Sequence, residues 1–390
     1  MIEGLIGGLF NGISIGAVLL IVALGLAIVF GLMGVINLAH GELMMLGAYT
    51  TYVVQNGAKA IGGSAVEFYI FAALPLAFLV AALTGLVLER GVIRHLYGRP
   101  LETLLATWGV SLILRQFIRS VSWSLVIGLI IFCVLFFGGR WILQKQANWQ
   151  QLKRIANPVV LLFSAAIALI TGFVINTNGG DTLSRAWFSA RNVDVTAPSW
   201  LRGGVSLGTT LQFPYARLFI IVLTALCLVG VYWFLNGTAW GLRIRSVTQN
   251  RGMSACLGIP TAKVDALTFA LGSGLAGIAG CAVTLLGSVG PNLGGNYIVD
   301  AFMVVVVGGV GKLVGSIVAA IIIGIVTYLL GSGTLALLLP ASEGLQPLLD
   351  LLTFFATTSM AKVMVFALII AFLQWKPAGM FPQKGRAVEV

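Results

Sequence analysis

The sequence predicts an all-α membrane protein, a polytopic bundle of transmembrane helices. Hydrophobic residues make up 59% of the 390 residues and charged residues 9%, whereas about a quarter of the residues in soluble domains are charged. The mean hydropathy is +1.03, and apolar runs long enough to cross a hydrocarbon core recur along the chain. The short alternating segments of a membrane β-barrel are absent from the sequence. We therefore expect one transmembrane domain over residues 1–390.

Long apolar runs give the positions of the expected spans. We predict spans at residues 5–30, 35–54, 68–88, 101–118, 125–137, 158–175, 215–235, 264–286, 297–310, 313–330 and 348–372. The 125–137 and 297–310 runs are the shortest, and two of the runs could be re-entrant instead of spanning.

Basic residues give the expected orientation. The formal net charge is +11, and Lys and Arg collect in alternate connections, a pattern typical of cytoplasmic loops and not of a nucleic-acid surface. We expect an inner (plasma) membrane protein with its N-terminus outside and its C-terminus in the cytoplasm. The first residues lack the basic region and cleavage site of a secretory signal, so they should form the first span. The basic connections contain Arg90, Arg94 and Arg99; Arg140, Lys145, Lys153 and Arg154; Arg243, Arg245, Arg251 and Lys263; Lys312; and Lys376, Lys384 and Arg386.

Two segments depart from a plain succession of spans. Residues 122–189 contain two apolar runs around a basic loop, so they should form an inserted helical hairpin that adds an even number of crossings. Residues 176–213 are polar and carry Asp181 and Asp194. We expect an extracytoplasmic loop there, to which a soluble partner could bind.

The polar stretch 240–260 separates two long apolar runs and has helix-compatible content. It carries Arg243, Arg245, Asn250 and Arg251, and it ends with Gly258 and Pro260, which are typical of a helix stop. We therefore predict a short cytoplasmic helix that a soluble partner binds.

Polar residues near the start of the second span are candidates for a solute path. Burying Asn37, His40 and Glu42 in a membrane is costly, so they should face the protein interior or a water-filled route. The alternative, to which we give more weight, is that they cap a helix start, with Asn37 as the N-cap. In both cases the stretch is expected close to the cytoplasm.

Other polar groups in the apolar runs have weaker claims to the path. Asp300 could be a path residue or could form an ion pair with Arg115 or Arg119. Thr107 and Ser111 lie one turn apart and could add hydroxyls to a polar lining, although such hydroxyls more often bond their own backbone or a neighbouring helix.

An enzyme is a weaker hypothesis than a transporter. Ser273 and His40 could in principle form a dyad, but glycine packing explains the sequence around Ser273 better. There is no HExxH motif, and the isolated cysteines have no metal-ligand spacing. Gly308–Lys312 fails as a phosphate loop because Leu313 stands where Ser or Thr is needed. We expect no cofactor, no metal and no ATP hydrolysis by this chain.

Two stretches resemble a known family. Residues 34–49, GVINLAHGELMMLGAY, are similar to the signature of the branched-chain amino acid ABC permeases, and residues 240–260 are similar to the loop by which those permeases bind their ATPases. Residues 49–55, 247–253 and 297–311 resemble the urea permeases within that family. The resemblance covers about residues 1–121 and 190–386, and the 122–189 hairpin has no counterpart in it.

The resemblance implies an architecture, partners and a solute. It implies about nine family spans or re-entrant segments plus the extra hairpin, a second homologous permease, two cytoplasmic ATPases and an extracytoplasmic binding protein. Urea or a related small amide is the expected solute; a branched-chain amino acid, or less favourably a passive urea or ammonium channel, is the alternative. On the coupling helix, Met253 and Leu257 should be buried in an ATPase cleft, a bulky residue at Gly258 should uncouple transport, and the expected rim consists of Arg243, Arg245 and Arg251.

Overall fold

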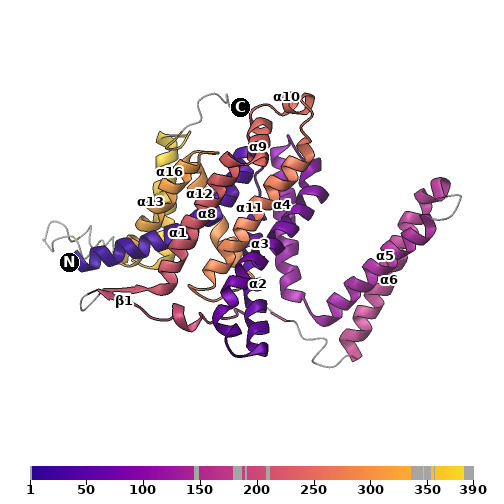
Figure 1. The fold of residues 1–390 in the computed structure, drawn as a ribbon, viewed down its shortest axis with the longest axis horizontal. Helices are drawn as coiled ribbons and strands as arrows, with labels where there is room; N and C mark the ends of the chain where they lie inside the picture. The colour runs from indigo at the N-terminus through magenta and orange to yellow at the C-terminus, as the bar shows by residue number, and fades with distance from the viewer. Residues whose placement is uncertain are drawn as a thin grey trace. The chain divides into compact units, whose positions relative to one another are not determined.

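The computed structural model describes residues 2–144, 149–178, 187–188, 191–207, 211–334, 346, 353–354 and 356–381, and helices dominate them (Figure 1). It divides into two compact units. The first contains Met1–Leu112 and Val193–Val390, and the second contains Ile113–Asn192. Parts of the predicted 176–213 loop, of the 348–372 span and of the C-terminal tail, including Lys384 and Arg386, lie outside the described residues, as does Lys145.

The predicted class, a polytopic helical bundle, is confirmed. Within the described residues, 8 helices are long and apolar enough to cross a membrane. The helices of the first unit are α1 (Ile2–Met33), α2 (His40–Ile61), α3 (Ala65–Gly91), η1 (Ile93–His95), η2 (Ser199–Leu201), α8 (Tyr215–Gly237), α9 (Ala239–Gln249), α10 (Arg251–Cys256), α11 (Thr261–Val283), α12 (Leu293–Gly308), α13 (Leu313–Gly331) and α16 (Thr358–Trp375). Helix α4 (Pro100–Ser120) begins in this unit.

A small antiparallel β-hairpin precedes α8. Strands β1 (Gly204–Leu207) and β2 (Leu211–Pro214) pair in the register Gly204↔Pro214. The preceding segment is held to the helices by side chains: Gln55 donates to the Thr196 carbonyl at 2.5 Å, and the Tyr69 hydroxyl donates to the same oxygen at 3.0 Å. The β-hairpin and these contacts mark one end of the first unit, called here the β-hairpin end.

Helices α1 and α11 form the centre of the first unit. In the most apolar stretch of each, 83% and 78% of the residues are buried. Their backbones approach closely at glycines: a Cβ atom on Gly272 would lie 2.7 Å from the Gly25 carbonyl oxygen. Small residues at such positions let helices pack in lipid, where no hydrophobic force draws them together.

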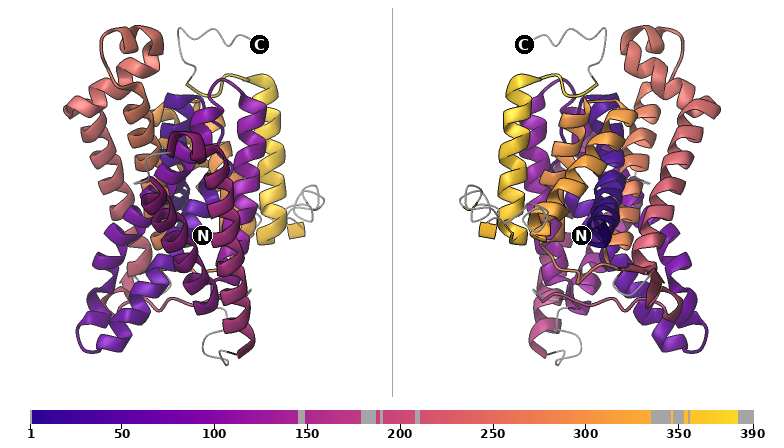
Figure 2. Two further views of the ribbon diagram at one scale, coloured as in Figure 1. Left: turned by 90° about the vertical axis from the view of Figure 1, so that its right-hand side faces the viewer. Right: turned by 90° about the vertical axis from the view of Figure 1, so that its left-hand side faces the viewer.

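The opposite end of the first unit carries α9 and α10 and is called the α10 end (Figure 2). Ile244 and Val247 of α9 are buried in an apolar cluster with Leu235 and Val264, and Leu313 packs against the same cluster. The buried face of α9 therefore fastens the loop between α8 and α11 to the bundle.

The second unit is built on a helical hairpin. Helices α5 (Trp123–Gln144) and α6 (Trp149–Asn178) pack along each other, and a Cβ atom on Gly128 would lie 3.2 Å from the Ala168 carbonyl oxygen. Phe132 and Phe136 stack on the hairpin with ring centroids 5.7 Å apart. Most of its apolar side chains are exposed, as expected for helices that face lipid.

Candidate functional site

The second span begins deep inside the bundle and not at its end. A ring nitrogen of His40, Nε2, lies 3.1 Å from the carbonyl oxygen of Val22, which is about two-thirds of the way along α1. Eleven residues of α1 separate Val22 from Met33, a rise of about 16 Å. Residues 34–39 therefore run back into the bundle as a non-helical segment, called here the re-entrant segment. The expectation that this stretch lies close to the cytoplasm stays a prediction.

The re-entrant segment satisfies its buried backbone with side chains. Gly34, with φ of +68°, turns the chain out of α1. Asn37 Oδ1 accepts from the Ala39 amide at 3.0 Å, and Thr107 Oγ1 of α4 accepts from the Leu38 amide at 3.2 Å. Non-helical backbone at membrane depth is tolerated where protein surrounds it in this way. The N-cap of α2 is Ala39, so the alternative that Asn37 is the N-cap is wrong.

Glu42 lies in the first turn of α2, where the helix dipole favours a carboxylate. Its Oε1 accepts a hydrogen bond of 3.0 Å from the Ser111 hydroxyl, and both side chains are buried. The structure therefore brings Glu42 together with Thr107 and Ser111, which the sequence placed on one face of a separate helix.

Three buried polar atoms, two at the start of α2 and one on α11 where its side chain packs against Gly85 of α3, have no hydrogen-bond partner among the described residues. They are Asn37 Nδ2, His40 Nδ1 and Ser273 Oγ. Ser273 follows Gly272 in α11. Gly272 packs against Gly25 of α1, and the His40 ring also packs on Gly25. These residues, with Glu42, Thr107 and Ser111, are called here the polar layer. Because unpaired buried polar groups are costly, such a layer is typical of a site that a polar ligand completes.

The part of the polar layer beside Asn37 and Thr107 is closed in this conformation. The space beside Asn37 and Thr107 is lined by Ala39, Leu88, Val92, Ile93 and Val110 and is too narrow for a water molecule. The ring nitrogen Nε2 of His40 is engaged by Val22, and no described contact joins the ring to Ser273. The structure therefore gives no support to a Ser273–His40 dyad.

Asp300 has a partner that the sequence analysis missed. Its Oδ2 lies 2.9 Å from Lys362 Nζ of α16, and the carboxylate is mostly buried whereas the ammonium is partly exposed. Lys362 also lies 5.9 Å from the centre of the Tyr297 ring. The described ion pair of Asp300 is thus formed with Lys362, a partner other than the expected Arg115 or Arg119. A lysine inside the predicted 348–372 run was the available signal.

The loop between α8 and α11 contains two helices and not the single helix that was predicted. Asn250 breaks them with φ of −152° and ψ of 100°, and its side chain caps α10 by accepting from the Met253 amide at 2.9 Å. Met253 and Leu257 are 60% and 75% exposed. Two large exposed apolar side chains, one on α10 and one at its C-cap, are available for a protein partner.

The three arginines of this loop differ in their contacts. Arg243 stacks on the Trp240 ring at 4.8 Å, and Arg245 donates to Asn236 Oδ1 at 3.1 Å, so both have local partners. Arg251 instead forms an ion pair of 2.5 Å with Asp265 of α11. Its guanidinium also lies 5.0 Å from the centre of the Tyr97 ring.

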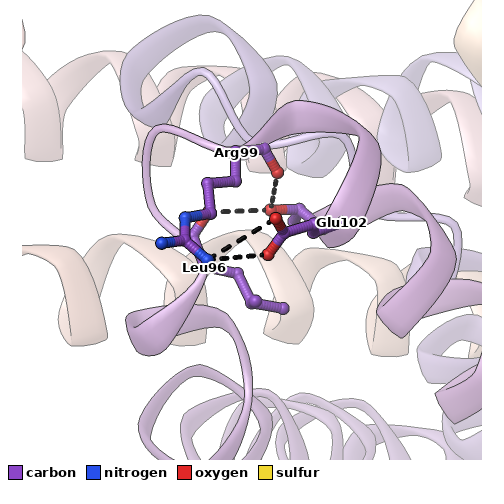
Figure 3. Close-up of polar contacts among 4 residues, drawn as sticks. Leu96, Arg99 and Glu102 are labelled. Carbon is purple, nitrogen blue, oxygen red and sulfur yellow. Dashed lines mark hydrogen bonds and ion pairs between the residues drawn. The ribbon is translucent and has the colours of Figure 1, made fainter.

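Tyr97 joins this ion pair to α3. Its hydroxyl donates to Glu89 Oε1 at 3.4 Å. Burial raises the pKa of the Tyr97 phenol, and the nearby Asp265 and Glu89 carboxylates raise it further, so the phenol stays protonated and remains a donor. The turn that follows is fixed by an Arg99–Glu102 ion pair of 3.1 Å and by the Thr103 hydroxyl, which donates to the Leu96 carbonyl at 3.0 Å (Figure 3).

Comparison with known proteins identifies the family. A family model described as "Branched-chain amino acid transport system / permease component" matches residues 8–373. The high-affinity branched-chain amino acid transport system permease protein LivH of Escherichia coli (strain K12) is 24% identical over 319 residues, which are 81% of this chain and 83% of that protein. BraD of Pseudomonas aeruginosa, a permease protein of the same description, is also 24% identical over 319 residues, with the same 81% and 83% coverage. No solved structure matches the chain significantly. The chain belongs to the branched-chain amino acid transport permease family and is a permease subunit of an ABC transporter.

Proposed function

We propose that this chain forms half of the solute path of an ABC importer for urea or a related small amide, with the polar layer as the place where solute passes. The observation that supports this best is the set of unpaired buried atoms, Asn37 Nδ2, His40 Nδ1 and Ser273 Oγ, beside a non-helical segment in the middle of the bundle. Interrupted helices near the middle of the membrane commonly build transporter binding sites.

The partners follow from the family. ABC importers combine permeases with ATPases and a binding protein, and we propose one homologous permease, two cytoplasmic ATPases and one extracytoplasmic binding protein. Met253 and Leu257 of α10 are the proposed apolar contacts with an ATPase, with Gly258, Arg243 and Arg245 beside them. ATP hydrolysis belongs to the partners.

The distribution of basic residues supports an orientation with the α10 end in the cytoplasm. Alternate connections at this end carry most of the arginine and lysine of the first unit, as the positive-inside rule requires. The N-terminus would then be outside and the C-terminus inside. The basic residues at the α10 end include Arg90, Arg94, Arg99, Arg243, Arg245, Arg251, Lys263 and Lys312, whereas the β-hairpin end has Lys59, Arg202 and Arg217.

The chemistry of the polar layer favours a neutral solute. Its unpaired groups are an amide, an imidazole nitrogen and a hydroxyl, which can donate and accept hydrogen bonds without charge. An amino acid carries an ammonium and a carboxylate, and moving both through a buried site requires compensating charges. Glu42, the carboxylate of the layer, is bonded to Ser111. A branched-chain amino acid is the second candidate, because the relatives carry that description.

Uptake by the reconstituted complex tests the proposal. Vesicles that contain this chain, the second permease and the ATPases should accumulate labelled urea when ATP and binding protein are present, and should not accumulate leucine. Accumulation of leucine alone would select the second candidate. Urea entry through this chain without partners or ATP would contradict an ABC importer and support a passive channel.

A matched pair of serine variants tests the polar layer itself. Ser273→Ala and Ser14→Ala each remove a buried hydroxyl that has no described partner. Ser14 lies eight residues from Val22 along α1, about 12 Å from the layer. We expect Ser273→Ala to change the apparent affinity or rate of uptake and Ser14→Ala to leave both unchanged. Equal behaviour of the two variants would remove Ser273 from the path.

A further inference from the structure

We propose that Arg251, Asp265 and Tyr97, called here the Arg251 cluster, are positioning residues that connect α10 to the re-entrant segment. The inference rests on the proposed role of α10 as the contact with an ATPase. It adds the route inside this chain by which a displacement of α10 reaches the polar layer.

Arg251 is suited to hold α10 to two elements at once. Its guanidinium bonds Asp265 at 2.5 Å on α11 and lies over the Tyr97 ring at 5.0 Å in the connection between α3 and α4. The side chain of Asp265 is only 4% exposed. A carboxylate buried to that degree depends on its cationic partner, so α10 cannot move away from α11 and Tyr97 without a large cost.

Tyr97 leads from Arg251 to an apolar cluster that includes a residue of the re-entrant segment. The ring packs against a buried apolar cluster formed by Val29, Val35, Ile93 and Phe269. Val35 belongs to the re-entrant segment, two residues before Asn37. Closely packed side chains transmit displacements because their packing leaves little free space. Movement of the Tyr97 ring would therefore act on the cluster that holds Val35, two residues before the polar layer.

A second route runs from Tyr97 through α4. The turn after Tyr97 is fastened by the buried Thr103 hydroxyl, which donates to the Leu96 carbonyl at 3.0 Å and to the Arg99 carbonyl at 2.8 Å. An exposed Arg99–Glu102 ion pair lies on the same turn (Figure 3). Helix α4 then carries Thr107 and Ser111 to the Leu38 amide and the Glu42 carboxylate. Both routes start at one guanidinium and end on the same segment.

The contacts of the other arginines show that this arrangement is specific to Arg251. Arg243 and Arg245 bind Trp240 and Asn236, which lie on α9 itself or on the end of α8. A residue that only anchored the loop would need no more than such local contacts. Arg251 instead contacts Asp265 on α11, the next helix along the chain, and Tyr97, which is distant in sequence and precedes the helix that reaches the polar layer.

The test compares variants of the cluster with a matched control in the full complex. Asp265→Asn, Arg251→Gln and Tyr97→Leu remove the ion pair or the ring, whereas Tyr97→Phe keeps the ring and loses only the 3.4 Å bond to Glu89. Arg217→Gln is the control, because Arg217 also bonds a side chain of another helix, Asn11 on α1, but at the β-hairpin end. Solute imported per ATP hydrolysed is measured with urea and with leucine, beside co-purification of the ATPases.

We expect Asp265→Asn, Arg251→Gln and Tyr97→Leu to lower the solute imported per ATP about tenfold, a size typical of coupling between residues in contact. ATPase binding and hydrolysis should persist, and Tyr97→Phe and Arg217→Gln should resemble the unmodified chain. A merely structural role would lower the yield of the complex and leave the ratio unchanged, which would overturn the proposal.

A readout that needs no solute completes the test. A fluorophore on Leu105→Cys, which is exposed on α4, in a chain whose other cysteines are replaced, should change its emission when ATP is added. The change should disappear in Tyr97→Leu.

A Leu257→Asp variant separates the two proposals: normal ATPase binding and uptake in that variant would refute the role of α10 itself. Loss of coupling in Leu257→Asp with a normal ratio and emission change in Tyr97→Leu would refute only the Arg251 cluster.

Discussion

The central helices α1 and α11 and the hairpin helices α5 and α6 are all apolar enough to span a membrane, yet their surroundings differ. The most apolar stretches of α1 and α11 are 83% and 78% buried, and those of α5 and α6 are each 6% buried. Hydropathy therefore identifies a span without showing whether protein or lipid surrounds it. The difference lies in the small residues, which let backbones meet.

Glycines illustrate this difference directly. On α11, Cβ atoms on Gly272, Gly277 and Gly280 would each collide with the backbone of another helix. On α6, a Cβ atom on Gly172 would meet nothing closer than the Ser124 carbonyl oxygen at 3.9 Å. Packing on the central helix α11 thus requires glycine at these positions. The position of Gly172 in the hairpin has room for a side chain.

The largest effect is expected for Gly272→Leu compared with Gly172→Leu. Overpacking against the Gly25 backbone should destabilise the permease by about 3 kcal/mol, because backbone cannot move aside as a flexible side chain can. Gly172→Leu should stay within about 0.5 kcal/mol. Thermal unfolding in detergent measures both. Similar losses in the two variants would break the distinction between central and hairpin helices.

A second, smaller effect is expected at intramembrane charges. Lys362→Met leaves the mostly buried Asp300 carboxylate without its cation, and because Lys362 is partly exposed we expect a loss of about 1–2 kcal/mol. Arg140 of the hairpin lies 5.6 Å from the Phe136 ring, and Arg140→Gln should cost about 0.5 kcal/mol.

Adding Asp300→Asn to Lys362→Met provides the control for that ion pair. The double variant removes the unpaired charge, so part of the lost stability should return. Thermal denaturation of Lys362→Met, the double variant and Arg140→Gln in the same detergent gives the comparison. A double variant less stable than Lys362→Met would show that Asp300 has another essential contact.

The sequence predicted the helical bundle and the polar residues of the layer, but not how they meet. Apolar runs follow from composition alone, so most spans were expected near their observed positions. The return of residues 34–39 into the bundle depends on the contacts of His40 with Val22 and of Thr107 with Leu38, which join distant parts of the chain. The Arg251–Asp265 ion pair likewise required knowing that α10 folds back on α11. Local patterns do not contain such tertiary pairings.

A third effect, of about 1 kcal/mol, is expected for Ser111→Ala, which removes the hydrogen bond to the buried Glu42. Thr84→Ala is the matched control, because the Thr84 hydroxyl is exposed and donates only to the Val80 carbonyl of its own helix. Unfolding temperature of the two variants measures the difference. No difference would show that Glu42 finds an equal donor elsewhere. Loss of a buried hydrogen bond would then be tolerated as readily as loss of an exposed one.

The smallest effect on the first unit is expected from replacing residues 123–188 with a flexible Gly/Ser linker. The hairpin belongs to a compact unit of its own and contains two helices long and apolar enough to cross a membrane, so its removal should leave the direction of every later helix unchanged. We expect the remaining bundle to lose less than about 1 kcal/mol, a shift in unfolding temperature of about 2–4 °C. The size-exclusion profile and the thermal unfolding of the shortened chain measure this loss.

One outcome would contradict this expectation: the shortened chain aggregates while Gly172→Leu remains well folded. The hairpin as a whole would then support the central helices, although the Gly172 position tolerates a side chain. The low burial of α5 and α6 would then underestimate how much the rest of the bundle depends on the hairpin.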